Sequence, residues 1–367
     1  MMPQIPLEPA YADQEKQFAR AFAILRAGIG EHVMPGATIA VTHGGRMMAW
    51  EAFGRFTYDP ESPLVRRETI FDLASVTKAV ATTTIAAILH ERGQLNLNQK
   101  VHEHFREFRD GGKSDVTIAM LLSHSSGLPS YEKLFQRCRS REDLLGSAAA
   151  APLAYPPGAR SEYSDLAFIL LGEILTRIAG EDLDGFAARE IFAPLGMTTA
   201  EYCPAPEGRQ EIPPAQDDRE FRHRTIQGEI DDENASVMGG VAGHAGLFAN
   251  AYDLALFAEC MLRGGAPILK PETVQLFTNR RAAPYGTSFS LGWDTPSQPS
   301  QSGTKLSARA FGHLGFTGTS LWIDPVKQLS ITLLTNRTWP HRQSQAIKQL
   351  RPAVHDAIVE AIPHDEI

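Results

Sequence analysis

Both ends of the chain carry β-strand patterns, whereas its long middle is helical. Residues 36–54, GATIAVTHGGRMMAWEAFG, read as two strands joined at Gly44-Gly45, because glycine supplies the positive φ of a tight hairpin turn. Near the other end, SFSLGWDT, GHLGFTGTSLWIDP and QLSITLLTN give three further strand candidates. The sequence therefore predicts an α/β chain of the α+β type, in which an antiparallel sheet made from both chain ends is flanked by helices.

The middle of the chain is expected to be a mostly helical insertion. Helical periodicity and glycine stops predict helices over residues 73–92, 164–179 and 250–263, and a further helix within residues 117–127. The Pro- and charge-rich segment from Pro204 to Arg224 is expected to be a loop. These patterns predict a discontinuous sheet domain of residues 1–75 and 285–367, a helical domain of residues 76–284, and an active site at their interface.

Composition excludes several classes of protein. Of the 367 residues, 43% are apolar and 21% charged, as in a globular enzyme, and the formal net charge of −8 provides no basic field for nucleic acid. Cys138, Cys203 and Cys260 are widely spaced and form no Cys-x-x-Cys pair, so neither a disulfide framework nor a zinc site is expected. No nucleotide fingerprint or His-Glu-x-x-His motif occurs, and we expect no metal and no cofactor.

The N-terminal residues show no secretory pattern. They lack a basic stretch followed by an apolar core, and no run approaches the roughly 20 apolar residues of a membrane span. We therefore expect no membrane span and a cytoplasmic protein, or a periplasmic or secreted one if a signal segment had been removed.

A serine and a lysine stand three residues apart where a predicted helix begins. In FDLASVTKAVATTTIAAIL, Ser75 and Lys78 share one face of the first helical turn, which places a hydroxyl beside an amine. Two other Ser-x-x-Lys pairs begin at Ser130 and Ser302, but neither opens an apolar helix. A helix start also presents free N–H groups and a positive dipole end, which stabilise an oxyanion. The alternative is that Ser75 only caps the helix.

Two further segments carry polar groups beside apolar elements. Tyr163-Ser164-Asp165 stands at the start of the strongly apolar helix of residues 164–179, and a tyrosine near a lysine loses its proton more easily. His313-Leu314-Gly315 lies on a predicted strand, where glycine lets a ligand approach the backbone. Tyr163 is therefore a candidate general base.

Taken in order, Ser-x-x-Lys, Tyr-Ser-Asp and His-x-Gly resemble the three motifs of penicillin-recognising serine hydrolases. The chain is most similar to the class C β-lactamase-like branch, which also holds D-alanyl carboxypeptidases, D-aminopeptidases and family VIII esterases. LLSHSSGLPSY, PPGARSEYSD, IFAPLGMTTAEY and GGVAGHAGLFANAYDLALF resemble that branch too. The resemblance covers roughly residues 33–336.

The resemblance implies a role for each motif residue. Ser75 would be the acylated nucleophile, and Lys78 would lower the pKa of Tyr163, which relays protons as base and then acid. The N–H groups of Ser75 and Phe316 would form the oxyanion hole, beside Gly315. Removing one such donor typically costs ~3 kcal/mol in an acyl transferase.

The remaining motif positions depart from the family pattern. Asp165 stands where the family usually has Asn, which holds the lysine and a substrate amide, and His313 stands where it usually has Lys. A histidine titrates near pH 6.5, so a substrate carboxylate would be held less well at neutral pH. We therefore expect esters or neutral amides to be favoured, and binding of carboxylates to strengthen as His313 becomes protonated. An alternative register places Phe316-Thr317-Gly318 at the third motif.

Three other segments carry polar or titratable side chains. His244, in GGVAGHAGLF, is expected to be a core or loop group outside the catalytic set. Residues 231–234, Asp-Asp-Glu-Asn, are expected to form a solvated acidic loop, with Asn234 as a substrate contact that the resemblance implies. His102 and His104 have no third ligand spaced nearby, so no metal site is expected there.

The resulting hypothesis is a serine hydrolase that forms an acyl-enzyme on a small-molecule ester, a β-lactam or a D-amino-acid amide or peptide. One alternative is a D-alanyl-D-alanine carboxypeptidase, which would be a penicillin-binding protein. The other is a binding or scaffold protein of the same fold that has lost turnover.

Overall fold

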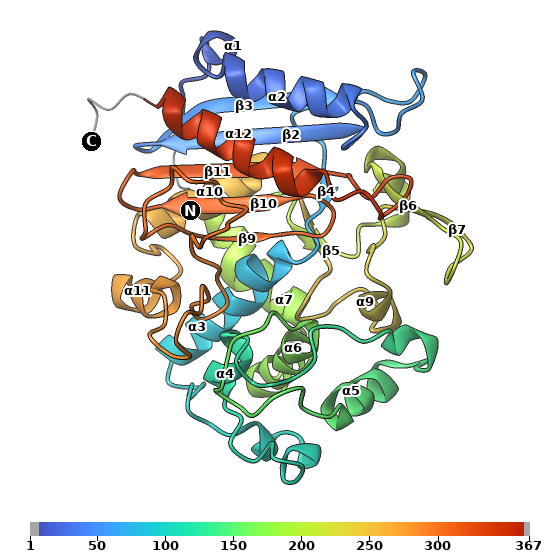
Figure 1. Ribbon diagram of the computed structural model, residues 1–367, viewed down its shortest axis with the longest axis vertical. Coiled ribbons are helices and arrows are strands. Elements are labelled where there is room, and N and C mark those ends of the chain that lie inside the picture. The colour runs from blue at the N-terminus through green and yellow to red at the C-terminus, as the bar shows by residue number, and fades with distance from the viewer. Residues whose placement is uncertain (1–6, 363–367) are drawn as a thin grey trace.

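The computed structural model describes residues 7–362 and is built around a six-stranded sheet with the strand order β1-β3-β2-β11-β10-β9. β1 runs parallel to β3, and every other neighbouring pair is antiparallel. Figure 1 shows that the strands come from the two ends of the chain, which confirms the expected sheet. The strands are β1 (Glu8–Pro9), β2 (Gly36–His43), β3 (Arg46–Gly54), β9 (Phe311–Leu314), β10 (Ser320–Asp324) and β11 (Leu329–Thr335).

The centre of this sheet joins the two ends of the chain directly. β2 pairs with β11, with Val41 opposite Ile331, and with β3 through the predicted turn at Gly44 and Gly45, whose φ angles are +55° and +78°. Every residue of β2 is buried because helices cover both faces of the sheet. β9, which carries His313, is left at the edge of the sheet.

Helices from both chain ends pack on one face of the sheet, and a helix from the middle packs on the other. α2 (Ala19–Gly30) lies against α12 (Ile347–Ala361), and their apolar side chains share a core with those of β2, β3 and β11. α10 (Ala251–Leu262) contacts β2, β10 and β11 and belongs to the second, larger core. The layers can be followed in Figure 1, with α12 in front of the sheet.

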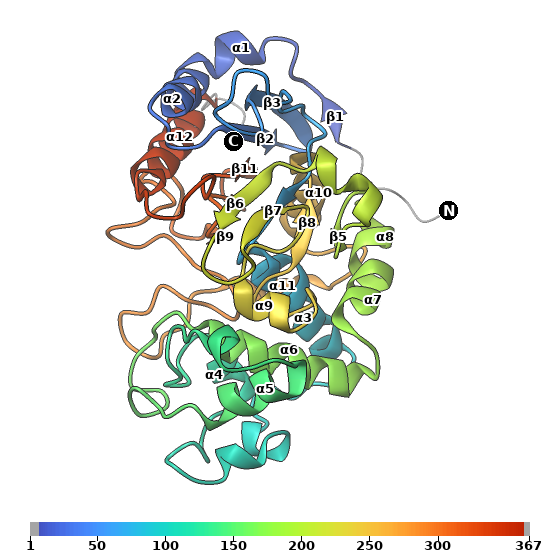
Figure 2. The same ribbon diagram turned by 90° about the vertical axis from the view of Figure 1, so that its right-hand side faces the viewer.

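Apart from α1, which lies above the sheet, the remaining helices lie mainly below it in Figures 1 and 2. The longest is α6 (Asp165–Ala179), which begins at the cap residue Ser164 and ends at Gly180 with a φ of +70°. The others are α1 (Gln14–Gln17), η1 (Lys78–Thr83), α3 (Thr84–Glu91), η2 (Val101–Glu103), η3 (Arg106–Phe108), α4 (Ile118–Leu122), η4 (Leu134–Gln136), α5 (Arg141–Ala150), α7 (Leu183–Ala187), η5 (Ala188–Phe192), α8 (Ala193–Leu195), η6 (Pro206–Glu211), α9 (Glu233–Val237) and α11 (Pro271–Thr278).

Three local expectations are wrong. The segment 204–224, expected to be a loop, contains η6 and β6 (Pro214–Asp218), and β6 pairs with β7 (Arg224–Gln227). The segment 288–295, expected to be a strand, forms only isolated bridges at Phe289 and Asp294. GHLGFTGTSLWIDP instead supplies two strands, β9 and β10, because Gly315 and Gly318 allow a turn between them.

The predicted division into two domains stays a prediction. The sheet is built from the two chain ends, but α10, which lies within the expected helical insertion, packs directly on that sheet. A second small sheet, with the order β4-β8-β5, joins β4 (Phe71–Asp72) to β8 (Leu247–Ala249) and β5 (Glu201–Tyr202). Segments from the predicted sheet and helical regions are therefore interleaved at the position of Ser75.

Candidate active site

Ser75 lies at the junction between β4 and the helical turn η1. The preceding residue, Ala74, has a φ of +48°, a left-handed conformation that a residue with a side chain rarely adopts and that concentrates at functional sites. η1 is a π-helical turn, another irregularity that is frequent at functional sites. Within residues 7–362 the N–H of Ser75 donates no hydrogen bond, so it is free to meet an oxyanion.

The structure brings four of the expected residues into contact. The Nζ of Lys78 and the hydroxyl of Tyr163 lie 2.9 Å and 2.6 Å from the Oγ of Ser75. The same Nζ lies 2.7 Å from Oδ1 of Asp165 and donates a hydrogen bond of 2.8 Å to the carbonyl of His244. Lys78 is fully buried, so all of its polar contacts are with the protein.

Tyr163 is held in place by the start of α6 and by a buried histidine. The hydroxyl of Ser164 accepts the N–H of Ala167, and the N–H of Ser164 donates to Nδ1 of His124 at 3.1 Å. The rings of His124 and Tyr163 lie 4.8 Å apart. These contacts fix the phenol beside Ser75.

Burial shifts the pKa values of Tyr163 and Lys78. Burial, with the negative charge of Asp165 acting in the same direction, raises the pKa of Tyr163 well above its ordinary value. The phenol of Tyr163 is therefore neutral in the resting site, and the expectation that Lys78 lowers its pKa stays a prediction. Burial lowers the pKa of Lys78, although Asp165 and Asp232 oppose that shift. A neutral amine is consequently more accessible here than in a solvated lysine.

The edge strand β9 places the third motif beside Tyr163. The ring of His313 lies 6.1 Å from that of Tyr163, and its side chain is buried. Burial, reinforced by the charge of Lys78, lowers the pKa of His313 to about 3. His313 is therefore neutral at physiological pH. The expectation that it titrates near pH 6.5 and tunes carboxylate binding between pH 5 and 8 is wrong.

Gly315 and Phe316 follow β9 and border the cavity. A Cβ on Gly315 would meet Oγ1 of Thr319 at 1.9 Å and the carbonyl of Leu73 at 2.5 Å, so only glycine fits there. The Phe316 side chain is 49% exposed, and its N–H donates no hydrogen bond within residues 7–362. The hydroxyl of Thr317 donates to the carbonyl of Asp72. Thr317, which belongs to the alternative register of the third motif, therefore supports the segment that precedes Ser75.

A cavity of about 950 Å³ contains these groups. Its lining includes Ser75, Tyr163, Asp165, His313, Gly315 and Phe316. Asn234 does not line it. Its amide accepts the N–H of Phe135 and donates to the carbonyl of Glu132, and its side chain is fully buried. This geometry corrects the expectation that Asn234 contacts substrate.

The acidic segment 231–234 is also buried and not a solvated loop. Asp232 caps α9 by accepting the N–H of Ala235, and its Oδ1 lies 2.9 Å from Nε2 of His244. Burial opposes ionisation of Asp232, but the charge of His244 and hydrogen bonds outweigh it and hold the pKa of Asp232 at about 2. The ring of His244 thus positions the acidic segment, and the backbone carbonyl of His244 positions Lys78.

Sequence reasoning missed Asp72, three residues before Ser75. Its carboxylate accepts the N–H groups of Ala74 and Asp231, each at 2.8 Å. Burial, with the neighbouring negative charge of Asp231, raises the pKa of Asp72 to about 7. The bond to Ala74 is local, but the bond to Asp231 joins segments that only folding brings together, so no sequence pattern marks this role.

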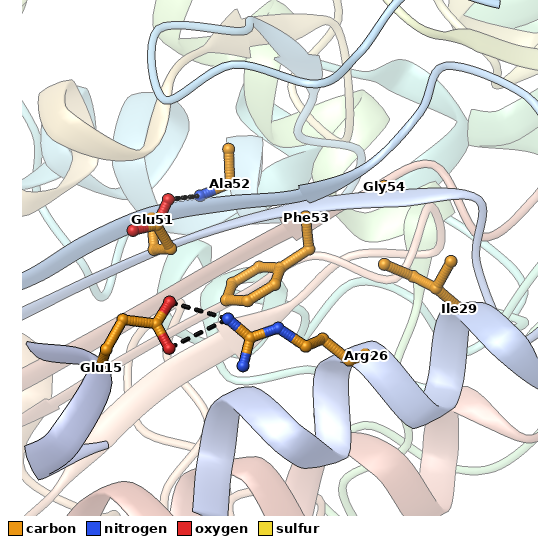
Figure 3. Close-up of a pocket in the computed structure, with 7 residues that line it drawn as sticks. All are labelled: Glu15, Arg26, Ile29, Glu51, Ala52, Phe53 and Gly54. Atoms are coloured by element: carbon orange, nitrogen blue, oxygen red, sulfur yellow. Dashed lines mark hydrogen bonds and ion pairs between the residues drawn. The ribbon is translucent and has the colours of Figure 1, made fainter. Parts of the chain in front are cut away.

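A second, smaller cavity of about 370 Å³ lies between α2 and β3. Figure 3 shows the carboxylate of Glu15 meeting the guanidinium of Arg26, at 2.7 Å and 3.0 Å, beside the ring of Phe53. The guanidinium also lies 5.4 Å from the Phe53 ring centroid. Glu15 and Arg26 thus neutralise each other, and none of the expected site residues lines this smaller cavity.

The described residues contain no helix with the length and apolarity required to cross a bilayer. Nor do residues 7–362 contain a group of three or more histidine, cysteine, aspartate and glutamate side chains arranged to bind a metal ion.

The fold and the site define a class of hydrolase, and comparison with known proteins identifies it. A family model described as Beta-lactamase matches residues 21–354, so the chain belongs to the β-lactamase family. It is therefore a β-lactamase-fold hydrolase of the type that includes penicillin-binding proteins, and both the resemblance and the predicted fold class are confirmed.

Two relatives are similar over most of their length. The chain is 33% identical to a Bacillus subtilis (strain 168) protein named N-acetylmuramyl-L-alanine amidase, over 83% of this chain and 77% of the relative. It is 32% identical to a putative D-alanyl-D-alanine carboxypeptidase of Escherichia coli (strain K12), over 74% of this chain and 70% of the relative.

Solved structures share the fold at lower identity. EstCE1, described as a hydrolase with promiscuous acyltransferase activity, superposes with a TM-score of 0.74 at 23% identity, covering 94% of this chain and 100% of EstCE1. A class C β-lactamase from Rhodobacter sphaeroides superposes with a TM-score of 0.72 at 20% identity, covering 93% and 99%. At these identities the likeness shows the fold alone.

Proposed function

We propose that this hydrolase works through an acyl-enzyme on Ser75, formed from a carboxylic ester, a β-lactam or a D-amino-acid amide or peptide. The observation that carries the proposal is that the Oγ of Ser75 contacts both Lys78 and Tyr163 at the wall of a large cavity. A nucleophile within hydrogen-bond reach of two proton-transfer groups is the geometry that acyl transfer requires.

The directions of the pKa shifts suggest how the proton moves. As Oγ bonds to the substrate carbonyl carbon, the proton of Ser75 passes to Lys78 in its neutral form, which burial makes easier to reach. The neutral phenol of Tyr163 gives its proton to the leaving group as the carbonyl carbon loses it. The ammonium of Lys78 then returns a proton to the phenolate, which restores both groups before water releases the acyl group by the same path. This assignment gives Lys78 a larger role than the sequence suggested.

Two backbone groups support the proposed oxyanion hole. The N–H groups of Ser75 and Phe316 both lack partners within residues 7–362, and both residues line the cavity. Asp165 serves as a positioning residue, because its carboxylate holds the buried amine of Lys78. His313 shapes the cavity as a neutral ring.

A D-alanyl-D-alanine carboxypeptidase is the second candidate. It is favoured by the Escherichia coli relative, whose name carries that activity at 32% identity. A non-catalytic binding or scaffold protein is not favoured by the site, because the serine, amine and phenol remain in contact. The cytoplasmic location expected from the sequence stays a prediction.

A fluorescent penicillin and a nitrophenyl ester, each applied to the parent protein and to Ser75→Ala, test the proposal. Ester turnover that disappears in Ser75→Ala, with a Ser75-linked acyl mass in the parent, supports the hydrolase. Stable labelling by penicillin without turnover of ester supports a penicillin-binding protein. Absence of both from folded parent protein contradicts the acyl-enzyme.

A further inference from the structure

The buried amine of Lys78 has three polar partners, and one of them is a backbone carbonyl. Its Nζ lies 2.9 Å from the Oγ of Ser75, 2.7 Å from Oδ1 of Asp165 and 2.8 Å from the carbonyl oxygen of His244. A carboxylate and a carbonyl only accept hydrogen bonds, whereas a hydroxyl also donates. In its neutral form the amine therefore gives its two N–H groups to the carboxylate and the carbonyl, and its lone pair points to the hydroxyl of Ser75.

The carbonyl of His244 thus helps to decide where the lone pair points. Without this acceptor, one N–H of the neutral amine would be free to turn toward Ser75, and the lone pair would turn away. Transfer of the serine proton requires the lone pair on the Ser75 side. The position of this carbonyl consequently matters for the proton transfer assigned to Lys78.

The backbone that carries this carbonyl lies against η1. The hydroxyl of Thr82 donates to the carbonyl of the preceding residue, Gly243, at 2.6 Å. Residues 239–246 contain four glycines, which makes this stretch easy to deform, and His244 carries the only polar side chain among them. The ring of His244 is therefore the side chain of this stretch that can anchor the carbonyl through a hydrogen bond.

The ring of His244 is held by Asp232. Its Nε2 lies 2.9 Å from Oδ1 of Asp232, whose pKa of about 2 keeps the carboxylate ionised, so Nε2 is the donor. The same oxygen accepts the N–H of Ala235 at 2.7 Å, which fixes the carboxylate at the start of α9. His244 is 1% exposed, and its Nδ1 has no partner within residues 7–362. The contact with Asp232 is thus the polar contact that orients the ring.

The contact between Asp232 and His244 is separate from the ion pairs next to it. Arg342 lies 3.1 Å from Oδ1 of Asp231 and 2.7 Å from Oε1 of Glu233. Asp232 lies between these two residues in the chain but contacts His244 instead. Both Asp232 and His244 line the large cavity. The two side chains therefore form a pair of their own beside the reacting groups.

The charge of Asp232 also reaches the amine. Burial lowers the pKa of Lys78, and the charges of Asp165 and Asp232 oppose that shift. Of the groups around them, Asp72 has a pKa of about 7, so a pH profile needs a variant that identifies the limb of Lys78. The other ionisable groups that interact electrostatically with Lys78 or Asp232 are His124, Tyr131, Tyr163, Glu233, His244 and His313.

We propose that Asp232 and His244 act as a positioning pair for Lys78, holding the acceptor that directs its lone pair to Ser75. This inference rests on the proposed function, because it concerns the group that takes the proton of the same serine. Asp165 holds the amine directly, whereas Asp232 holds it through the ring and the backbone of His244. Neither member of the pair needs to touch the substrate.

The first experiment removes the charge of Asp232 and keeps its hydrogen bonds. Asp232→Asn retains an oxygen that accepts both N–H groups, and asparagine is favoured at a helix N-cap. Loss of the nearby anion lowers the pKa of Lys78, so the acid limb of kcat/KM for a nitrophenyl ester should move to lower pH by roughly 0.5–1 unit. Glu220→Gln removes an exposed carboxylate of the same cavity and should leave this limb in place.

The second experiment changes the ring of His244. His244→Leu removes the donor to Asp232, and we expect kcat to fall on the order of 10-fold with little change in KM, because the amine is oriented less well. His244→Gln can donate to the same carboxylate and should recover most of kcat. Urea unfolding of both variants measures their stability separately.

Asp165→Asn identifies the limb that belongs to Lys78, because it removes the carboxylate in direct contact with the amine. If Asp165→Asn moves the acid limb and Asp232→Asn does not, the positioning pair is overturned and the hydrolase stands. Equal loss of kcat in His244→Gln and His244→Leu, in step with lost stability, also overturns the pair, since a purely structural histidine would behave in this way.

Two outcomes concern the proposed function itself. An acid limb that Asp165→Asn leaves in place contradicts proton transfer to Lys78, and with it the positioning pair. Absence of Ser75-dependent turnover and acylation in folded parent protein contradicts the acyl-enzyme. If Asp232→Asn fails to fold, the comparison of kcat between His244→Gln and His244→Leu still decides the role of the pair.

Discussion

The two cavities of this molecule treat charge in opposite ways. In the small cavity, Glu15 and Arg26 pair with each other in solvent, with side chains 58% and 53% exposed (Figure 3). In the large cavity, Lys78 is fully buried between a nucleophile and a carboxylate, and Arg351 is buried with no carboxylate partner among residues 7–362. This difference indicates that buried charged side chains, which water cannot solvate, mark the functional cavity. An exposed ion pair by itself does not mark a functional cavity.

The largest effect should follow removal of the buried amine. Lys78→Met leaves Ser75 without an acceptor for its proton, and we expect kcat for a nitrophenyl ester to fall roughly 10³- to 10⁴-fold. The variant also leaves Asp165 without its partner, which destabilises the fold by about 3–5 kcal/mol for a fully buried pair and by less here, since Asp165 is partly exposed.

The double variant Lys78→Met/Asp165→Asn separates catalysis from stability. It removes the unpaired carboxylate, so urea unfolding should show stability regained while turnover stays lost. Recovery of turnover in the double variant would contradict the role of Lys78.

The phenol should matter next. Tyr163→Phe removes the proposed donor to the leaving group, and we expect a loss of roughly 10²- to 10³-fold in kcat. Tyr155→Phe is the matched control, because its hydroxyl makes a long 3.4 Å contact with the carbonyl of His124 and does not contact Ser75 within residues 7–362. Steady-state kinetics with one ester compares the two variants, and similar losses in both would argue against a specific role for Tyr163.

The buried imidazole should affect stability rather than the pH profile of catalysis. The pKa of His313 is about 3 in the folded protein and near 6.5 in an unfolded chain, so protons bind the unfolded chain preferentially between these values. Its contribution is lost as pH falls from 6.5 towards 3. His313→Asn should therefore reduce the loss of stability between pH 7 and pH 4.5 by roughly 1–3 kcal/mol.

His313→Asn also tests whether the ring of His313 affects the pH dependence of catalysis. His313→Asn should leave the shape of the kcat/KM profile between pH 5 and 8 as it is in the parent, because the ring is neutral throughout that range. If the kcat/KM profile of the parent shows an inflection near pH 6.5 that is absent in the variant, His313 titrates as the sequence predicted.

The smallest effect is expected in the small cavity. Arg26→Gln or Glu15→Gln breaks an exposed pair, which typically contributes about 0–1 kcal/mol, and ester turnover should stay at the parent level. Urea unfolding and steady-state kinetics check both statements. A loss of turnover comparable to that of Tyr163→Phe would remove the distinction between the two cavities.

Much of the fold could be predicted because its patterns are local. The hairpin at Gly44-Gly45, the helix starts at Ser164 and Asn250, and the apolar runs of β2 and β11 are written in neighbouring residues. The predictions were wrong for segments whose composition is typical of a solvated loop but which are paired or buried in the structure. The segment 204–224 is rich in charge and proline but pairs β6 with β7, and the acidic segment 231–234 is buried by Arg342 and by the N-terminal turn of α9.

The sequence by itself determined the reactive groups, because a serine and a lysine three residues apart at a helix start must share one face. It also indicated the phenol and the edge strand, through their likeness to a known set of motifs. Only the tertiary structure decided the charge states, which are a neutral phenol at Tyr163 and a neutral ring at His313. The physical reason is that burial sets these properties, and burial depends on residues hundreds of positions apart in the chain.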